Sequence, residues 1–481
     1  MANAPPSPPP AGEIINEHSV EISQNSNKIA TINNSIDDIV ERYMVSSTTS
    51  LLFPFFASLA WIFDCQQTFI NVFSDSQPSW HCTSTACNVT TTLSTPCNLP
   101  SSSWSFSHPR HISTISDFSL ECSSPVLLAL PSSSFYAGCL VGGLLLATLA
   151  DSFLGRKYTL FLSCLIMSLT AALTALSPNL AVYSVLRFCS GFARANVGTT
   201  AYVLSSEQVP RRQRNNVSII TFLLCTTGFL TLPIISFLNR ENSWRLLYLY
   251  TSIPSLLYSI FLFFFMKESP RWLFVKGRRE EAIETLKKLS CSKKIECFSN
   301  SAVMCSVKTE SGNLYSAMRM LREKRWALRR LLAIVMAGFG IGIMYHGMPL
   351  NLGNFNASLY IAVALNAAVE LLSALVVFFL AEVMSRRRFM VGLMVVSGGC
   401  SLACTAMGGW LAVVVELLAF FGVFTAFAVL MIYMVELFPT CVRTSALAVV
   451  RQAVVEAGGG TRRGCGTGNS GGGEDEKVSF V

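Results

Sequence analysis

Charged side chains are scarce in this chain of 481 residues. Asp, Glu, Lys and Arg together make up 13% of the sequence, about half of the share that soluble globular domains carry. Hydrophobic residues account for 51% of the chain, and the mean hydropathy is +0.48. This composition excludes a disordered chain, a coiled coil and a secreted disulfide scaffold, and it indicates an integral membrane protein.

The sequence also lacks the patterns that enzymes and nucleic-acid-binding proteins carry. We find no phosphate-binding loop, no nucleophile arrangement and no metal-ligand cluster, so we expect no catalytic residue, no cofactor and no metal site. The net charge of +8 is concentrated in loops between apolar runs. That distribution is typical of cytosolic loops in a membrane protein rather than of a nucleic-acid partner.

Long apolar runs are what the chain has instead. A helix needs about 20 apolar residues to cross the hydrocarbon, and helices satisfy their own backbone hydrogen bonds there. We therefore expect an all-α polytopic protein with the lipid bilayer as its partner and about ten membrane-spanning helices, near residues 48–70, 133–150, 158–177, 181–204, 217–238, 244–266, 331–351, 358–380, 389–407 and 410–434.

Lys and Arg predict the orientation of these spans. Residues 267–330 hold 16 basic and 7 acidic side chains, whereas residues 71–132 contain Arg110 as their one Lys or Arg. The positive-inside rule places the first segment in the cytosol and the second outside or in a lumen. No cleavable signal precedes the first span, so that span serves as the signal. The predicted organisation is a cytosolic segment 1–47, a six-helix bundle 48–266 with the external loop 71–132, a cytoplasmic linker 267–330 with short helices, an incomplete four-helix bundle 331–453 and a disordered Gly-rich tail 454–481.

The external loop carries features of an oxidising compartment. Its four cysteines, Cys82, Cys87, Cys97 and Cys122, allow two disulfides in three possible pairings. Asn88 begins an Asn-Val-Thr acceptor for glycosylation on the same side. We therefore predict a glycoprotein.

Charged motifs recur in the two halves of the chain at a spacing of about 230 residues. Glu207-Gln-Val-Pro-Arg-Arg-Gln-Arg214 follows the fourth span, and Glu436-Leu-Phe-Pro-Thr-Cys-Val-Arg443 follows the tenth, 229 residues later. Asp151-Ser-Phe-Leu-Gly-Arg156 and Glu382-Val-Met-Ser-Arg386 form a second pair. Two matches in the same order indicate a duplicated six-span unit.

These repeated acids and arginines can form salt bridges at one membrane face, which would act as a cytoplasmic gate between two bundles. The alternative is that they anchor loops among lipid headgroups and set the topology alone. The predicted gate comprises Asp151, Arg156, Glu207, Arg214, Glu268, Arg271, Glu382, Arg386, Glu436 and Arg443.

The same motifs resemble those of the major facilitator superfamily, and Lys267-Glu-Ser-Pro-Arg-Trp-Leu273 is similar to the signature of its sugar-porter branch. The Cys-bearing external loop, Phe63-Asp-Cys-Gln-Gln67 and Val450-Arg-Gln-Ala453 resemble the plant organic cation/carnitine transporters. The resemblance implies a major facilitator fold with two pseudo-symmetric bundles. Members of that family have twelve spans, so we expect this chain to lack spans 11 and 12.

Ionisable residues inside predicted spans are candidates for binding a substrate, because burying an unpaired charge in the membrane costs about 2.5–3.5 kcal/mol. Glu370 is the first choice because it lies mid-span and the second half has no equally central basic residue. Glu416 and Arg187 are alternatives to it, or structural charges that are satisfied by one another or by the local backbone. The full set of candidates is Glu370, Asp64, Glu416, Arg187, Tyr345 and Trp61.

An acidic cavity with aromatic walls suits a small organic cation. The sequence therefore predicts a carrier of organic cations or carnitine in the plasma membrane or the vacuolar membrane, driven by voltage, protons or a coupling cation. His346, beside Tyr345, could relay protons, although a packed histidine is the simpler interpretation. The alternatives are a proton-coupled carrier of sugars or other polar solutes and a truncated membrane protein that transports nothing.

Overall fold

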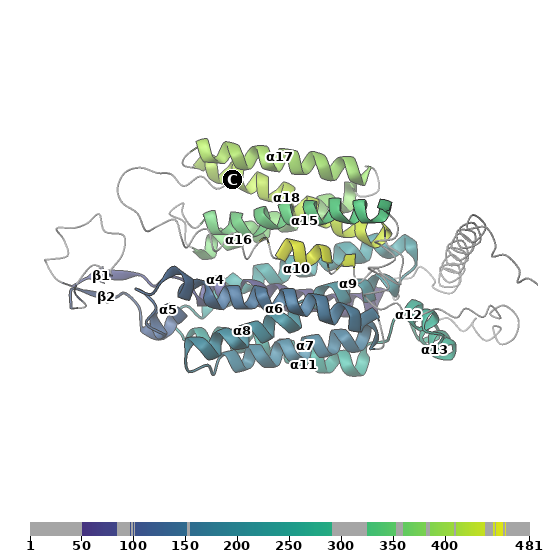
Figure 1. The fold of residues 1–481 in the computed structure, drawn as a ribbon, viewed down its shortest axis with the longest axis horizontal. Helices are drawn as coiled ribbons and strands as arrows, with labels where there is room; N and C mark the ends of the chain where they lie inside the picture. The colour runs from purple at the N-terminus through teal and green to yellow at the C-terminus, as the bar shows by residue number, and fades with distance from the viewer. Residues whose placement is uncertain are drawn as a thin grey trace, which may run out of the picture.

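The computed structural model describes most of the membrane-embedded chain. The described residues are 51–83, 97, 100, 102–151, 154–290, 325–352, 359–380, 385–407, 410–437 and 446–457 without 448 and 456. Helices dominate, and the N-terminal and C-terminal halves form two layers that meet along α10 (Arg214–Leu238) and α16 (Leu359–Leu380). The all-α polytopic fold expected from the composition is confirmed (Figure 1).

Seven helices of the described chain are long and apolar enough to cross a membrane, and a shorter apolar helix, Val363–Val377, lies within α16. Two other predicted spans are interrupted. The run 48–70 becomes α2 (Leu52–Ser58), α3 (Ala60–Phe69) and α4 (Asn71–Ser74), and the run 181–204 becomes α8 (Leu180–Arg194) and α9 (Val197–Glu207). Because of these breaks, neither run contains a single helix long enough to be counted among the seven membrane-spanning helices.

The remaining helices of the N-terminal half are continuous even where they contain proline. Pro131, Pro233 and Pro254 lie inside helices, which membrane helices tolerate because neighbouring groups satisfy the freed carbonyls. Side chains of Asn179 and Ser243 cap α8 and α11 (Trp244–Phe265) by accepting backbone N–H bonds. The elements are α6 (Pro125–Asp151), α7 (Gly155–Thr174), η5 (Arg211–Gln213), α10 and α11 (Trp244–Phe265).

The C-terminal half contains α15 (Arg325–Leu352), α16, α17 (Arg386–Ala406) and α18 (Trp410–Leu437). Its described residues between 446 and 457 are also helical, and Val454, Val455 and Ala457 are buried. The helix thus continues past residue 453, where we expected the tail to begin. Residues 458–481 lie outside the described chain, so the lack of spans 11 and 12 stays a prediction.

The predicted external loop and the predicted cytoplasmic linker lie at opposite ends of the helix bundle (Figure 1). At one end, β1 (Trp80–Cys82) pairs antiparallel with β2 (Trp104–Phe106), followed by η4 (Arg110–Ile112) and α5 (Thr114–Asp117). At the other end lie α12 (Pro270–Val275) and α13 (Arg279–Ser290). Leu286 and Leu289 of α13 pack against Phe53, which braces the start of the first span.

One of the disulfide pairings left open by the sequence is resolved. Cys97 bonds to Cys122, with their Cα atoms 5.4 Å apart. Cys82 is also disulfide-bonded, whereas Cys87 and the glycosylation acceptor Asn88 lie outside the described residues. The loop is therefore fastened to the segment that leads into α6.

Helices α6 and α8 pack with their backbones in close contact. A Cβ atom added to Gly138 would lie 2.1 Å from the carbonyl oxygen of Phe188, and one added to Gly191 would lie 2.1 Å from that of Phe135. Small residues at helix crossings in membranes allow this approach. Glycine at these positions therefore sets the spacing of the two helices.

We predict that Gly138→Ala lowers the thermal unfolding temperature of the detergent-purified protein, because overpacking against backbone costs about 1–3 kcal/mol. The matched control is Gly398→Ala in α17, where an added Cβ meets nothing within 4 Å. That change should leave the unfolding temperature equal or slightly higher, since alanine favours helix. Equal unfolding temperatures for the two variants would contradict the close packing.

Candidate substrate site between the two bundles

Glu370 lies fully buried on α16, with a side-chain exposure of 0%. Its carboxyl oxygens accept hydrogen bonds from the Tyr345 hydroxyl at 2.9 Å and from the Thr226 hydroxyl at 3.4 Å. No lysine or arginine of the described chain forms an ion pair with it. Two neutral hydroxyl groups therefore serve as its partners, one from each half of the protein.

Aromatic rings surround the Glu370 partner Tyr345. Its ring stacks on Phe420, Phe424 and Phe427 of α18, with centroid distances of 5.7, 6.1 and 6.1 Å. Phe69 of α3 meets the same ring edge-on at 6.1 Å. The carboxyl group and the ring faces together form an environment that attracts cations.

Asp64 on α3 is buried as well, but it has basic partners. Arg194 donates to both of its oxygens, at 2.9 and 3.1 Å, and Arg451 donates to Oδ2. Trp61, another predicted site residue, lies one turn earlier with its ring under the Arg451 guanidinium at 4.9 Å. Arg194 and Arg451 are not among the predicted site residues, although both are basic residues in apolar surroundings, the feature that made Arg187 a candidate.

Arg187 and Glu416 were predicted either to bind substrate or, as structural charges, to be satisfied by one another or by the local backbone. Glu416 is buried on α18. Arg187 is buried on α8, over the Phe135 ring at 4.2 Å, with Nη1 3.5 Å from the carbonyl of Gln67. Arg187 therefore contacts a backbone carbonyl, one of the predicted alternatives, and among the described residues no ion pair joins it to Glu416. His346, the candidate proton relay, has Nδ1 3.1 Å from the Gly342 carbonyl.

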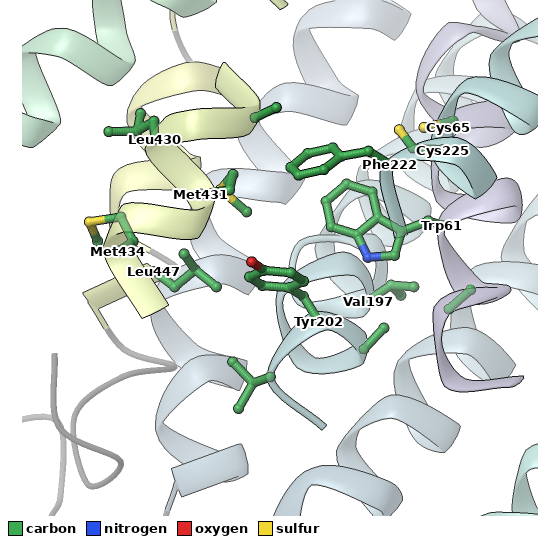
Figure 2. Close-up of a cluster of buried hydrophobic side chains, with 14 of the residues drawn as sticks. Trp61, Cys65, Val197, Tyr202, Phe222, Cys225, Leu430, Met431, Met434 and Leu447 are labelled. Atoms are coloured by element: carbon green, nitrogen blue, oxygen red, sulfur yellow. The ribbon is translucent and has the colours of Figure 1, made fainter. Parts of the chain in front are cut away.

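The two halves of the protein meet in a continuous apolar cluster next to these charges. Figure 2 shows Trp61, Phe222 and Tyr202 of the N-terminal half facing Met431 of α18 and Leu447. The thiols of Cys65 and Cys225 lie side by side in the same view. The candidate site thus sits between the bundles rather than inside either one.

A second group of charges lies at the end of the bundle that carries α12 and α13. Arg156 forms an ion pair with Glu207 at 3.3 Å, and the Ser269 hydroxyl donates to the same carboxylate at 2.7 Å. Arg271 donates to the carbonyl of Val209 at 3.3 Å. These contacts join α7, α9 and α12 within the N-terminal half. Together with Glu268, which contacts the start of α7, they bring together four of the predicted gate residues: Arg156, Glu207, Glu268 and Arg271.

Glu268 accepts backbone N–H bonds from Arg156 and Lys157 in the first turn of α7 and from Ser269. A carboxylate at this position complements the positive end of the helix dipole. Burial raises the pKa of Glu268, and the three N–H donors and Arg156 lower it in part. Glu268 is thus a buried acid held by backbone donors.

The other predicted gate residues are less completely described. Arg214 is the first residue of α10 and is half-buried. Glu382 and Arg443 lie outside the described residues, and the side chains of Asp151, Arg386 and Glu436 do too. A gate across both halves therefore stays a prediction.

Buried charges between two helical bundles are a feature of membrane carriers, whose substrate sites lie at such interfaces. The family model "Sugar (and other) transporter" matches residues 67–457. Organic cation/carnitine transporters 2 and 3 of Arabidopsis thaliana are 44% and 46% identical over 443 and 411 residues, which cover 88% and 83% of this chain and 84% and 79% of theirs. The chain therefore belongs to the sugar (and other) transporter family of the major facilitator superfamily, among the organic cation/carnitine transporters, a family of transporters rather than enzymes.

Solved structures show the same fold at low sequence identity. A proton:xylose symporter bound to 6-bromo-6-deoxy-D-glucose aligns with a TM-score of 0.56 and 18% identity, over 86% of this chain and 87% of that one. The partially occluded, inward-open xylose transporter from E. coli aligns with a TM-score of 0.57 and 17% identity, over 89% and 93%. The major facilitator fold expected from the motifs is confirmed.

We predict that Gly155→Ala weakens the contact between α7 and Glu268. Gly155 has a φ of +82°, and an added Cβ would lie 2.5 Å from Oε2 of Glu268. An alanine held in this left-handed backbone conformation costs about 1–2 kcal/mol, and displacement of the Glu268 carboxylate adds to that cost. Thermal unfolding of the purified variant should therefore occur at a lower temperature.

Gly277→Ala is the matched control, because Gly277 has a φ of +76° and an added Cβ meets nothing within 4 Å. This variant bears only the cost of the left-handed backbone conformation, so it should unfold at a higher temperature than Gly155→Ala. If both variants unfold at the same temperature, the Glu268 contact contributes nothing to stability.

Proposed function

We propose that this protein carries small organic cations, carnitine among them, across the plasma membrane or the vacuolar membrane by alternating access. The observation that supports this most is Glu370, a carboxyl group with 0% exposure whose described partners are two hydroxyl groups. An acid that has no basic partner in a membrane protein is a candidate for binding a cationic ligand.

The physical reason lies in the cost of burial. A carboxylate removed from water without a counter-charge is strongly disfavoured, and a bound ammonium group supplies that counter-charge. Each aromatic face that the cation reaches adds about 0.5–2 kcal/mol. Tyr345 links the counter-charge and the aromatic contribution, because its hydroxyl donates to Glu370 while its ring stacks on Phe420.

The names of the relatives agree with this assignment. Three plant relatives above 40% identity are called organic cation/carnitine transporters, whereas the xylose symporters share the fold at 17–18% identity. A sugar would be recognised by neutral hydrogen-bonding groups, and it would leave the charge of Glu370 without a partner. We therefore favour the cation over a sugar or another polar solute.

Transport would proceed by rocking of the two bundles around this site, with the cytoplasmic ion pairs as a gate. The membrane potential supplies about 2.3 kcal/mol per elementary charge per 100 mV, enough for roughly fifty-fold accumulation of a monovalent cation. A uniporter of cations needs no further coupling. A proton gradient would matter if a carboxyl group such as Glu370 exchanged its proton for substrate.

We predict that Glu370→Gln lowers the uptake efficiency (Vmax/KM) for carnitine and for choline at least ten-fold in cells that express the protein, because a neutral amide does not attract the ammonium group. Tyr345→Phe should lower it less, by about two- to five-fold, since the ring remains. Uptake is measured with radiolabelled substrates, and the amount of protein at the membrane is measured in parallel.

Glu281→Gln serves as the matched control, because Glu281 is an exposed acid on α13 that pairs with Arg278. It should leave both uptakes unchanged. Normal uptake by Glu370→Gln would remove this residue from the site. Proton-dependent uptake of a hexose but not of carnitine would favour the sugar carrier, and no uptake of any solute would favour the non-transporting protein.

A further inference from the structure

The buried side of α16 is a single stripe along the helix. Its members recur at spacings of three and four residues, which places them on one face. The stripe includes Val363, Asn366, Ala367, Glu370, Ser373 and Ala374. Three of these residues, Asn366, Glu370 and Ser373, are polar, and each is 0% exposed.

Two of the three polar residues have hydrogen-bond partners, and Asn366 has none. Ser373 Oγ lies 2.6 Å from Thr425 Oγ1 of α18, and Glu370 accepts from the two hydroxyl groups described above. Neither Nδ2 nor Oδ1 of Asn366 has a hydrogen-bond partner in the described chain. A side-chain amide can donate two hydrogen bonds and accept two, and burying it with none of them made is costly. A ligand that supplies these hydrogen bonds would remove that cost.

Asn366 lies one helical turn from Glu370. Residues four apart on a helix are neighbours on the same face, with Cβ atoms about 5–6 Å apart. Val363 and Ala367, the neighbours of Asn366 on the stripe, belong to a hydrophobic cluster that Tyr345 also packs against. Tyr345 in turn donates its hydroxyl hydrogen bond to Glu370. The amide of Asn366 therefore borders the candidate cation site.

The chemistry of an amide decides what it can recognise. An amide is neutral, so it does not pair a second charge, but it binds a group that both donates and accepts hydrogen bonds. A hydroxyl group is such a group. In choline and in carnitine the hydroxyl group lies two carbons from the ammonium nitrogen, so the two polar groups are closer together than one helical turn of about 5.4 Å.

We propose that Asn366 is a specificity-determining residue that binds a hydroxyl group of the substrate while Glu370 holds the ammonium group. The preferred substrates are then quaternary ammonium compounds with a hydroxyl group two carbons from the nitrogen. This inference rests on the proposed function and narrows it. No covalent step is involved: the hydroxyl group donates to Oδ1 or accepts from Nδ2 of Asn366.

The selectivity arises from what an analogue without the hydroxyl group leaves behind. Such an analogue keeps the pairing of its ammonium group with Glu370, but it leaves both polar atoms of Asn366 buried without a partner. A site built to bind a hydroxyl group rejects the analogue that lacks it for this reason. Because Asn366 is 0% exposed, contact with bulk water does not replace the missing partner.

The experiment uses two pairs of compounds that differ in the hydroxyl group alone. Carnitine is compared with γ-butyrobetaine, and choline is compared with ethyltrimethylammonium. Vmax/KM is measured with radiolabelled compounds in cells that express the protein. In the wild type, the hydroxylated member of each pair should be carried at least five-fold more efficiently. Equal efficiencies within either pair would overturn the proposal, and this comparison needs no variant.

Three variants then assign the preference to its residue. Asn366→Leu, which is similar in size and makes no hydrogen bonds, should bring the ratio within each pair close to one, chiefly by lowering uptake of the hydroxylated compound. Asn366→Ser should retain part of the preference, because its hydroxyl group both donates and accepts. Glu370→Gln should lower the uptake of all four compounds without changing either ratio.

Asn242→Leu is the matched control, because Asn242 is an exposed asparagine between α10 and α11. It should change neither ratio. The amount of each variant at the membrane is measured in parallel with uptake.

Unchanged ratios in Asn366→Leu, with normal amounts of protein at the membrane, would show that another group reads the hydroxyl and would overturn the proposal. An equal loss of all four uptakes in that variant would make Asn366 structural and overturn it too. In both cases uptake of choline by the wild type would leave the proposed function standing. If the wild type carries none of the four compounds, the proposed function fails and this inference fails with it.

Discussion

The pairing of buried charges is the constraint on which this structure depends. Inside the membrane an ionisable side chain must find an opposite charge, a set of hydrogen-bond donors or a ligand. Asp64 has two arginines, and Glu268, near the predicted cytoplasmic face, has three backbone donors. Glu370 has two hydroxyl groups and no basic partner in the described chain. Asp64 and Glu268 therefore have the partners of structural charges, whereas a ligand can supply the basic partner that Glu370 lacks.

The same constraint relates the site to the architecture. Thr226 and Tyr345 reach Glu370 from opposite halves, and Asp64 and Arg451 pair across the halves. A carrier that alternates its access must remake contacts of this kind as its bundles move. Each of the two carboxylates has two partners, so loss of one contact leaves Glu370 with the other hydroxyl group, and it leaves Asp64 with Arg194 when Arg451 departs.

Much of the fold could be predicted from local sequence, and much of the site could not. Apolar run length located the membrane helices, and the spacing of charged motifs indicated the duplicated architecture. Glu370 stood out because it is an acid in a long apolar run. The partners of Asp64 did not, since Arg194 and Arg451 are 130 and 387 residues away and meet it through tertiary packing alone. The breaks at Leu59 and Ala195 carry no proline or glycine signal, so those spans read as continuous.

The most direct test of the central claim is the thermal unfolding of the purified protein with increasing carnitine, with glucose as the comparison. A ligand that binds the folded state stabilises it by RT ln(1 + [L]/Kd), so the unfolding temperature rises as the ligand concentration increases above Kd. The account predicts a rise with carnitine that disappears in Glu370→Gln, and no rise with glucose. A rise with glucose, or an undiminished carnitine effect in Glu370→Gln, would contradict the assignment of that carboxyl group to cation binding.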